Sequence, residues 1–256
     1  MLTTSSNFTE NAASLALPEG LQTMSPAMLD ATNYYQWIAE TIMPVAGQRI
    51  LDVGGGMGCL LPYFKHAEKL FALDIAESSV AFLEKRFENL SHCEVLLGDI
   101  NTQAIQKHYI AENVDTILCT NVLEHVEYDD AMLKAFHNIL APKKGALALL
   151  VPAHQWLYGT MDEQAGHYRR YSKNKLTQQV AGAGFKIKQT QYFNALAALG
   201  WFINGRVFKK STLSDVEMNT QIRFYDKKLI PVARKIERVF SPPVGLSIII
   251  LAEAVL

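Results

Sequence analysis

The chain has 256 residues, of which 49% are apolar and 19% charged, and this balance predicts a globular domain with a sizeable core rather than a disordered chain. Its length suits one α/β domain with an embellishment and is short for two full domains. The formal net charge is −1, so the chain lacks the overall positive charge that attracts nucleic acid. We therefore exclude nucleic acid as a first candidate partner.

The cysteines and the apolar runs bear on where the protein works. Cys59, Cys93 and Cys119 are widely separated and show neither disulfide nor zinc-site spacing. Residues 1–15 lack the basic start and apolar run of a signal peptide, and no apolar stretch reaches the roughly 20 residues that span a bilayer. We therefore expect a cytoplasmic protein with reduced thiols, no metal site and no transmembrane segment.

The periodicity of apolar residues predicts the fold class. After a polar, turn-rich arm, a helix is expected at residues 26–43, and strands then alternate with helices. The expected strands cover residues 50–53, 69–75, 93–100, 114–121, 145–152, 185–193 and 246–255. The expected helices cover residues 60–67, 78–89 (capped by Ser78 or Ser79), 128–140 and 172–183. This alternation predicts an α/β fold with a mostly parallel, seven-stranded sheet and helices on both faces.

One segment departs from this alternation and is expected to form about two helices that cap the sheet. The predicted organisation is therefore an N-terminal arm and helix, a core, a helical cap insertion and a final strand of the core sheet, at residues 1–46, 47–193, 194–240 and 241–256. Because right-handed crossovers place the loops after parallel strands along one edge, we expect the functional residues at that edge.

Three alternating glycines, Gly54, Gly56 and Gly58, directly follow the first predicted strand. Glycine lets the backbone turn sharply and approach a ligand closely. A dinucleotide fingerprint requires a third glycine where Cys59 stands, and a phosphate-binding Walker loop requires a lysine and a serine or threonine that are absent here. With Asp52, the turn reads D-x-G-x-G-x-G.

This pattern resembles class I S-adenosylmethionine-dependent methyltransferases, and the resemblance extends along most of the chain. It implies a Rossmann-like fold that binds S-adenosylmethionine and releases S-adenosylhomocysteine. Asp74 ends the second strand, where a carboxylate accepts hydrogen bonds from the ribose diol. Asp99 is expected at the adenine amino group with Ile100 against the ring, and Asn121 beside the methionine part. Each acid alone would instead suit a helix cap or a solvated turn.

The stretch NYYQW at residues 33–37 resembles a bacterial small-molecule branch of this superfamily, in which an aromatic helix closes over the cofactor. His125, in the stretch LEHV, is expected beside the cofactor or as a residue that positions the loop. The predicted cofactor-binding residues are Tyr34, Tyr35, Trp37, Asp52, Gly54, Gly56, Gly58, Asp74, Ile75, Asp99, Ile100, Asn121, Val122 and His125.

The loop after the fifth strand is rich in histidine, tyrosine and arginine, and loops at this edge carry function more often than packing. A hydroxyl, phenol or ammonium acceptor must lose a proton, and histidine titrates near neutrality. His167 is our first candidate for the base or a substrate orienter, and Asp162 is expected to orient a histidine. His154 is the second candidate, with the capping of a turn as its alternative role.

Two arginines and two tyrosines of the same loop are predicted to contact the acceptor. Arg169 and Arg170 suit bidentate binding of an anionic acceptor, or they pair with local acids and anchor the loop. Tyr158 and Tyr171 are expected to be pocket walls. With Asp162 and Trp201 of the cap, these four residues complete the predicted substrate-binding set.

The cap is apolar, with Trp201, Phe202 and Phe208, and is interpreted as a lid over an acceptor that has a hydrophobic part. A dimer face, or a shallow membrane contact favoured by the nearby Arg206, Lys209 and Lys210, remains an alternative. The predicted function is methyl transfer to O, N or C of a small or lipid-like acceptor. An accessory protein that binds the cofactor without methyl transfer, or a dinucleotide-dependent oxidoreductase, is the competing hypothesis.

Overall fold

The computed structural model describes residues 26–202 and 215–256, without the side chains of residues 26, 199–202 and 215–218. The predicted arm at residues 1–20 lies outside the described residues. The side chains of six cap residues also lie outside that description, namely Trp201, Phe202, Arg206, Phe208, Lys209 and Lys210.

Seven strands form one sheet in the order β3-β2-β1-β4-β5-β7-β6. The first five run parallel, and β7 pairs antiparallel with β5 and with β6. This arrangement confirms the predicted seven-stranded, mostly parallel sheet. The strands are β1 (Arg49–Val53), β2 (Lys69–Asp74), β3 (Cys93–Leu97), β4 (Thr116–Thr120), β5 (Ala146–Pro152), β6 (Phe185–Phe193) and β7 (Ser247–Ala254).

Helices cover both faces of the sheet, as predicted. Alternate residues of β1 face opposite layers, so Leu51 joins one apolar cluster and Ile50 the other. The first cluster includes side chains of α4 (Gln103–Ala111), α5 (Asp129–Leu140) and α7 (Lys173–Gly182). The second cluster includes side chains of α2 (Thr32–Ile42), α3 (Glu77–Phe87) and α10 (Ile230–Val239).

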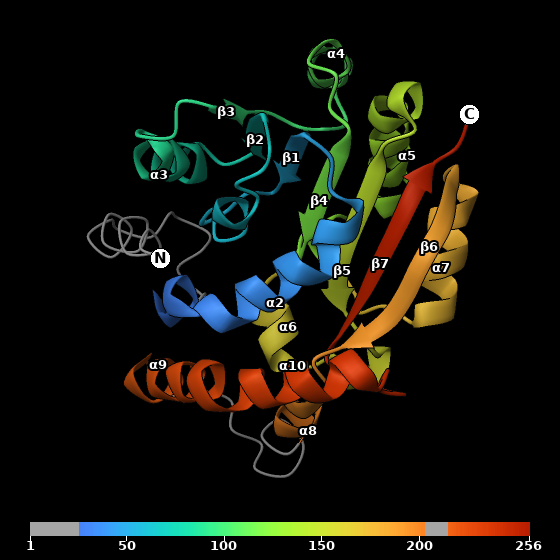
Figure 1. The fold of residues 1–256 in the computed structure, drawn as a ribbon. Helices are drawn as coiled ribbons and strands as arrows, with labels where there is room; N and C mark the ends of the chain where they lie inside the picture. The colour runs from blue at the N-terminus through green and yellow to red at the C-terminus, as the bar shows by residue number, and fades with distance from the viewer. Residues whose placement is uncertain (1–25, 203–214) are drawn as a thin grey trace.

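The remaining helical elements are short or belong to the cap. Figure 1 shows α2, α6 and the rod formed by α9 and α10 gathered at the end of the sheet toward which β5 points. A π-helical segment, η8, joins α9 to α10. These elements are α6 (Thr160–Gln164), α8 (Ala195–Phe202), α9 (Asp215–Phe224), η8 (Tyr225–Leu229), and the 3-10 helices η1 (Pro26–Asp30), η2 (Met43–Val45), η3 (Leu61–Tyr63), η4 (Leu123–His125), η5 (Ala141–Lys143) and η6 (Gln155–Leu157).

The structure differs from the predicted elements at three places. The helix expected at residues 60–67 is only the single turn η3, because Phe64 leaves the helical region at φ −93° and ψ 52°, and β2 begins five residues later. Helix α4 was not predicted, since only one of its side chains, Tyr109, is buried and the apolar periodicity is weak. Ala76, rather than Ser78 or Ser79, occupies the cap position of α3.

Candidate functional site

The glycine turn has the backbone that its sequence requires. Gly54, Gly56 and Gly58 have φ values of 71°, 52° and 64°, in the left-handed region that favours glycine. The Gly56 amide donates to Asp74 Oδ2 at 3.0 Å, which ties the turn to the end of β2. A Cβ atom on Gly54 would lie 2.5 Å from Val122 Cγ2, so the turn also touches the loop after β4.

The predicted acidic residues stand at successive strand ends. Asp52 is 3% exposed, and burial, together with the charge of Asp74, raises its pKa to about 7. Asp99 is exposed and accepts a hydrogen bond from the Asn101 amide at 2.8 Å. Asp74 and Asp99 therefore lie where a ligand can reach them, whereas Asp52 lies beneath the turn.

The two predicted isoleucines differ in their surroundings. Ile75 is 76% exposed beside Asp74 and offers an apolar surface at the edge of the sheet. Ile100 is 2% exposed and belongs to a core cluster. The core position of Ile100 supports the loop after β3 and leaves little of its side chain for the expected contact with an adenine ring.

Helix α2 lies over the glycine turn and over the end of β4. A hydrogen bond joins Tyr34 to Asn121, and burial raises the pKa of Tyr34 to about 12. Tyr35 makes a hydrogen bond with Cys59, next to the last glycine of the turn. The predicted aromatic helix is thus in place over both loops.

Packing of Trp37 and hydrogen bonds to the cap stabilise the position of α2. Trp37 is 6% exposed, and its ring centroid lies 4.0 Å from that of Phe193 at the end of β6. Asp226 of η8 is buried and accepts the backbone amides of Asn33 at 3.3 Å and Tyr34 at 2.9 Å. The cap therefore fixes the start of α2, and Trp37 serves packing more than ligand contact.

The loop after β4 brings polar groups to the same edge. Asn121 has a φ of 54°, a left-handed conformation in which asparagine is enriched, and its amide donates to the Leu150 carbonyl at 2.7 Å. The single turn η4 follows directly and contains Glu124 and His125. The sharp turn at Asn121 therefore brings these two side chains to the edge of the sheet.

Asp162 and His167, which the sequence analysis pairs as orienting carboxylate and histidine, lie in hydrogen-bond contact. The Nδ1 atom of His167 lies 2.8 Å from Asp162 Oδ1, and because the carboxylate only accepts hydrogen bonds, Nδ1 carries the proton. Asp162 also accepts Arg170 Nε at 2.8 Å and the Gly159 amide at 3.0 Å. Burial alone would raise the pKa of Asp162, but hydrogen bonds from His167 and Arg170 outweigh it and lower the pKa.

Glu124 is the residue that the sequence interpretation missed. It is 0% exposed, and neither carboxylate oxygen has a hydrogen-bond partner on another described residue. Burial raises its pKa to about 8. The rings of His125 and His167 meet edge to face with centroids 4.6 Å apart, and desolvation and His167 lower the pKa of His125 to about 4. The acid directly before His125 in the stretch LEHV was the available signal.

His154 lies apart from this cluster. Its backbone is left-handed at φ 64°, and its ring stacks on Tyr192 with centroids 4.8 Å apart. Its Nε2 atom is buried without a hydrogen-bond partner in the part of the chain that the structure describes. Desolvation and the nearby Arg170 lower its pKa. Because its ring stacks on Tyr192 and its Nε2 atom is buried, we interpret His154 as a packing residue more than as a second catalytic base.

The predicted substrate-binding residues of the loop mostly hold the loop itself. Arg169 donates to the Glu127 carbonyl at 2.8 Å and pairs with Asp129 at 3.0 Å. Tyr171 is 6% exposed, and its hydroxyl lies 2.9 Å from Asp129 Oδ2. The Tyr158 hydroxyl donates to the His167 carbonyl at 2.7 Å. With the pairing of Arg170 and Asp162, these contacts favour the anchoring alternative over substrate binding.

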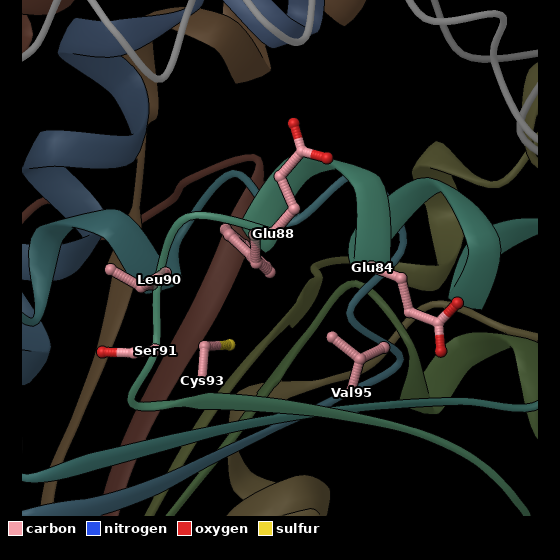
Figure 2. A pocket seen from close by; sticks show the side chains of 7 residues that line it. Glu84, Glu88, Leu90, Ser91, Cys93 and Val95 are labelled. Atoms are coloured by element: carbon pink, nitrogen blue, oxygen red, sulfur yellow. The ribbon is translucent and has the colours of Figure 1, made fainter.

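A hollow of about 250 Å³ lies away from this edge. Figure 2 shows Cys93 and Val95 on the strand side, beneath Glu84 and Glu88 on the helix side. These residues lie at the end of α3, directly after it and on β3, so the hollow is separate from the carboxyl ends of the strands. Among the described residues, no helix is long and apolar enough to cross a membrane.

Comparisons with known proteins agree with this geometry. A family model described as a methyltransferase domain matches residues 22–190. Over 106 residues the chain is 33% identical to (S)-coclaurine N-methyltransferase from Thalictrum flavum subsp. glaucum, and the match covers 40% of this chain and 28% of that relative.

Solved structures show the same fold at low identity. A magnesium protoporphyrin IX methyltransferase from Synechocystis PCC 6803, with bound S-adenosylhomocysteine, has a TM-score of 0.54 at 14% identity and covers 97% of this chain and 93% of its own. A methyltransferase from Archaeoglobus fulgidus has a TM-score of 0.52 at 15% identity, with 87% and 94% covered. The [4+2]-cyclase SpnF has a TM-score of 0.55 at 18% identity, with 88% and 81% covered. The chain belongs to the methyltransferase domain family and has the Rossmann-like fold of these solved structures.

Proposed function

We propose that this protein transfers the methyl group of S-adenosylmethionine to O, N or C of a small, partly hydrophobic acceptor. The observation that carries the proposal is that the glycine turn, Asp74 and Asn121 meet at one edge beneath Tyr34 and Tyr35. In the reaction, an acceptor lone pair forms the bond to the methyl carbon. The carbon–sulfur bond breaks, and its electron pair stays on sulfur as S-adenosylhomocysteine leaves.

His167 is the proposed base or substrate orienter. Its Nδ1 proton is held by Asp162, so Nε2 carries the lone pair that receives the proton of the acceptor or binds its hydroxyl. We expect His167→Ala to lower turnover far more than cofactor affinity. Unchanged turnover in this variant would remove His167 from the mechanism.

The competing hypotheses differ in the cofactor that the protein binds and in whether the protein catalyses methyl transfer. The likeness to SpnF, a cyclase by name, shows why the fold alone leaves the reaction open. Calorimetric titration with S-adenosylmethionine, S-adenosylhomocysteine and NAD distinguishes a methyltransferase from an oxidoreductase, and tight binding of NAD alone would refute the proposal. We expect Gly56→Val, at φ 52°, to abolish cofactor binding while the fold survives.

Cofactor binding without methyl transfer would favour the accessory role. A screen of hydroxyl, amine and carbon acceptors with labelled cofactor tests this, and labelled product with any of them supports the enzyme. Arg169 contacts Glu127 and Asp129 beyond the loop, and Arg170 contacts Asp162 within it, so these contacts favour an anchoring role over binding of an anionic acceptor. The three cysteines are free thiols, which supports the proposed cytoplasmic location.

Helix α10 supports an acceptor that is lipid-like and presented at a membrane surface. Val232, Ile236 and Val239 are 48%, 51% and 90% exposed and follow one stripe of the helix. Lys228 and Lys235 are exposed beside this stripe. The acid of the helix instead turns inward, where Glu237 accepts the amides of residues 194 and 195. An apolar stripe beside cations is typical of a helix that lies on anionic lipid.

Vesicle co-sedimentation tests this membrane contact. We expect the chain to bind vesicles that contain phosphatidylglycerol and not vesicles of phosphatidylcholine alone, and Ile236→Asp to reduce binding. The matched control is Ile110→Asp, because Ile110 is 38% exposed on α4, at the other face of the sheet. An equal loss of vesicle binding in both variants would contradict a specific membrane contact. A wild-type chain that dimerises through this stripe and does not bind vesicles would also contradict it.

A further inference from the structure

We propose that Glu124, His125 and His167 bind a divalent transition-metal ion, with Zn²⁺ the ion that this donor set suits best. Each residue offers one ligand atom, and the three atoms lie within 4.8 Å of one another. One carboxylate with two imidazoles is a donor set of catalytic zinc sites, where it leaves positions open for water or substrate.

The orientation of both histidines suits a metal ligand. His167 donates its Nδ1 proton to Asp162, so its Nε2 lone pair faces Glu124 Oε1 at 4.0 Å. A ring nitrogen of His125 hydrogen bonds to the backbone of Gly166, which leaves the other ring nitrogen for the ion. A metal-binding histidine generally donates its second ring N–H to a carboxylate or a carbonyl in this manner.

Glu124 gives a second, independent indication. A fully buried carboxylate without a hydrogen-bond partner on another described residue is costly, and a bound cation would compensate for that cost. Ligands of a tetrahedral zinc ion lie about 3.4 Å apart, given zinc–ligand bonds of about 2.1 Å. The 4.0 Å between Glu124 and His167, and separations of no more than 4.8 Å within the set, therefore need inward movements of about 1 Å.

The ion deepens the proposed function and rests on it for the acceptor. Its open positions would hold an acceptor with an oxygen donor, such as an alcohol or a phenol. A metal-bound hydroxyl releases its proton to solvent at a lower pH than a free hydroxyl, which leaves an oxygen lone pair for the methyl carbon. In the metal-bound state His167 is a ligand, and the ion takes over the task of the base.

Calorimetry with the full-length chain tests the site. After treatment with a chelator and dialysis, titration with ZnCl₂ should show one site per chain. Glu124→Gln should weaken zinc binding by about 100-fold or more, and Asp162→Asn, a positioning residue, by about 10- to 100-fold. The matched control is His108→Asn, because His108 forms another histidine–carboxylate pair with Glu94 at 2.9 Å and lies elsewhere.

A second readout protects the test against misfolding. Co²⁺ bound to the wild-type chain should give visible absorption typical of imidazole and carboxylate ligands, and His125→Asn, at an exposed position, should lose it. Affinity for S-adenosylhomocysteine should change less than about twofold in Glu124→Gln and in Asp162→Asn, neither of which is a predicted cofactor-binding residue, so failure of metal binding and failure of cofactor binding are distinguished. The proposal would be overturned if titration of the wild-type chain with ZnCl₂ gave no heat of binding. It would also be overturned if Glu124→Gln and His108→Asn bound zinc with equal affinity.

Discussion

Replacing the buried Asp52 by asparagine should make the protein more stable at alkaline pH. Asp52 is 3% exposed, and burial with the neighbouring charge of Asp74 raises its pKa from 3.8 to about 7. Between these two pH values, the folded chain keeps a proton that the unfolded chain has released. Stability therefore falls as the pH rises through this window, and the full penalty is present above pH 7.

The magnitude follows from the two pKa values. One pKa unit corresponds to about 1.4 kcal/mol, so ionisation of Asp52 costs up to about 4 kcal/mol above pH 7. Part of this cost is already present at about pH 5. We expect the advantage of Asp52→Asn over wild type to grow by about 3 kcal/mol between about pH 5 and about pH 8.

Urea unfolding of both proteins at the two pH values measures this difference. The control is Glu68→Gln, at an exposed position, for which we expect no comparable change. A gain that is equal at both pH values, or no gain at about pH 8, would refute the reasoning. Because Asp52 lies beneath the glycine turn that is proposed to hold the cofactor, we also expect the more stable variant to bind S-adenosylmethionine less tightly.

Three further substitutions test the site and its support. Gly54→Val should abolish binding of S-adenosylhomocysteine by calorimetry with the circular dichroism spectrum retained, because its Cβ would lie 2.5 Å from Val122; normal binding would place the cofactor elsewhere. Tyr171→Phe should lower the free energy of unfolding in urea by about 1–3 kcal/mol, because the buried Asp129 loses a donor; an unchanged value would show that the hydroxyl is dispensable. Trp37→Ala should cost about 3–5 kcal/mol in the same assay, and a loss below about 1 kcal/mol would contradict its packing on Phe193.

The sheet and the cofactor loops could be predicted from local patterns. Runs of apolar residues indicate buried strands, and parallel strands bring their carboxyl ends to one edge, so the positions of Asp74 and Asn121 followed from chain order. The glycine turn required left-handed backbone, which few other residues adopt. These features depend on short stretches of sequence and on general rules of topology.

Local patterns failed where a single turn or a weak periodicity decided the outcome. The segment after the glycine turn has a helical composition, but β2 begins too soon for a helix to form. Helix α4 buries one side chain and so leaves little signal in the sequence. Such elements are determined by the space that neighbouring strands leave for them.

The sequence by itself determined the methyltransferase fold and the edge at which the cofactor is expected, because those depend on residues close together in the chain. Only the tertiary structure decided which side chains meet between the loop after β4 and the loop after β5. Glu124 and His167 lie 43 positions apart and meet within 4.0 Å, whereas Arg169 turns to Asp129. The physical reason is that burying a charged side chain costs free energy unless another group pairs with it. Which group is close enough to pair depends on how the whole chain packs.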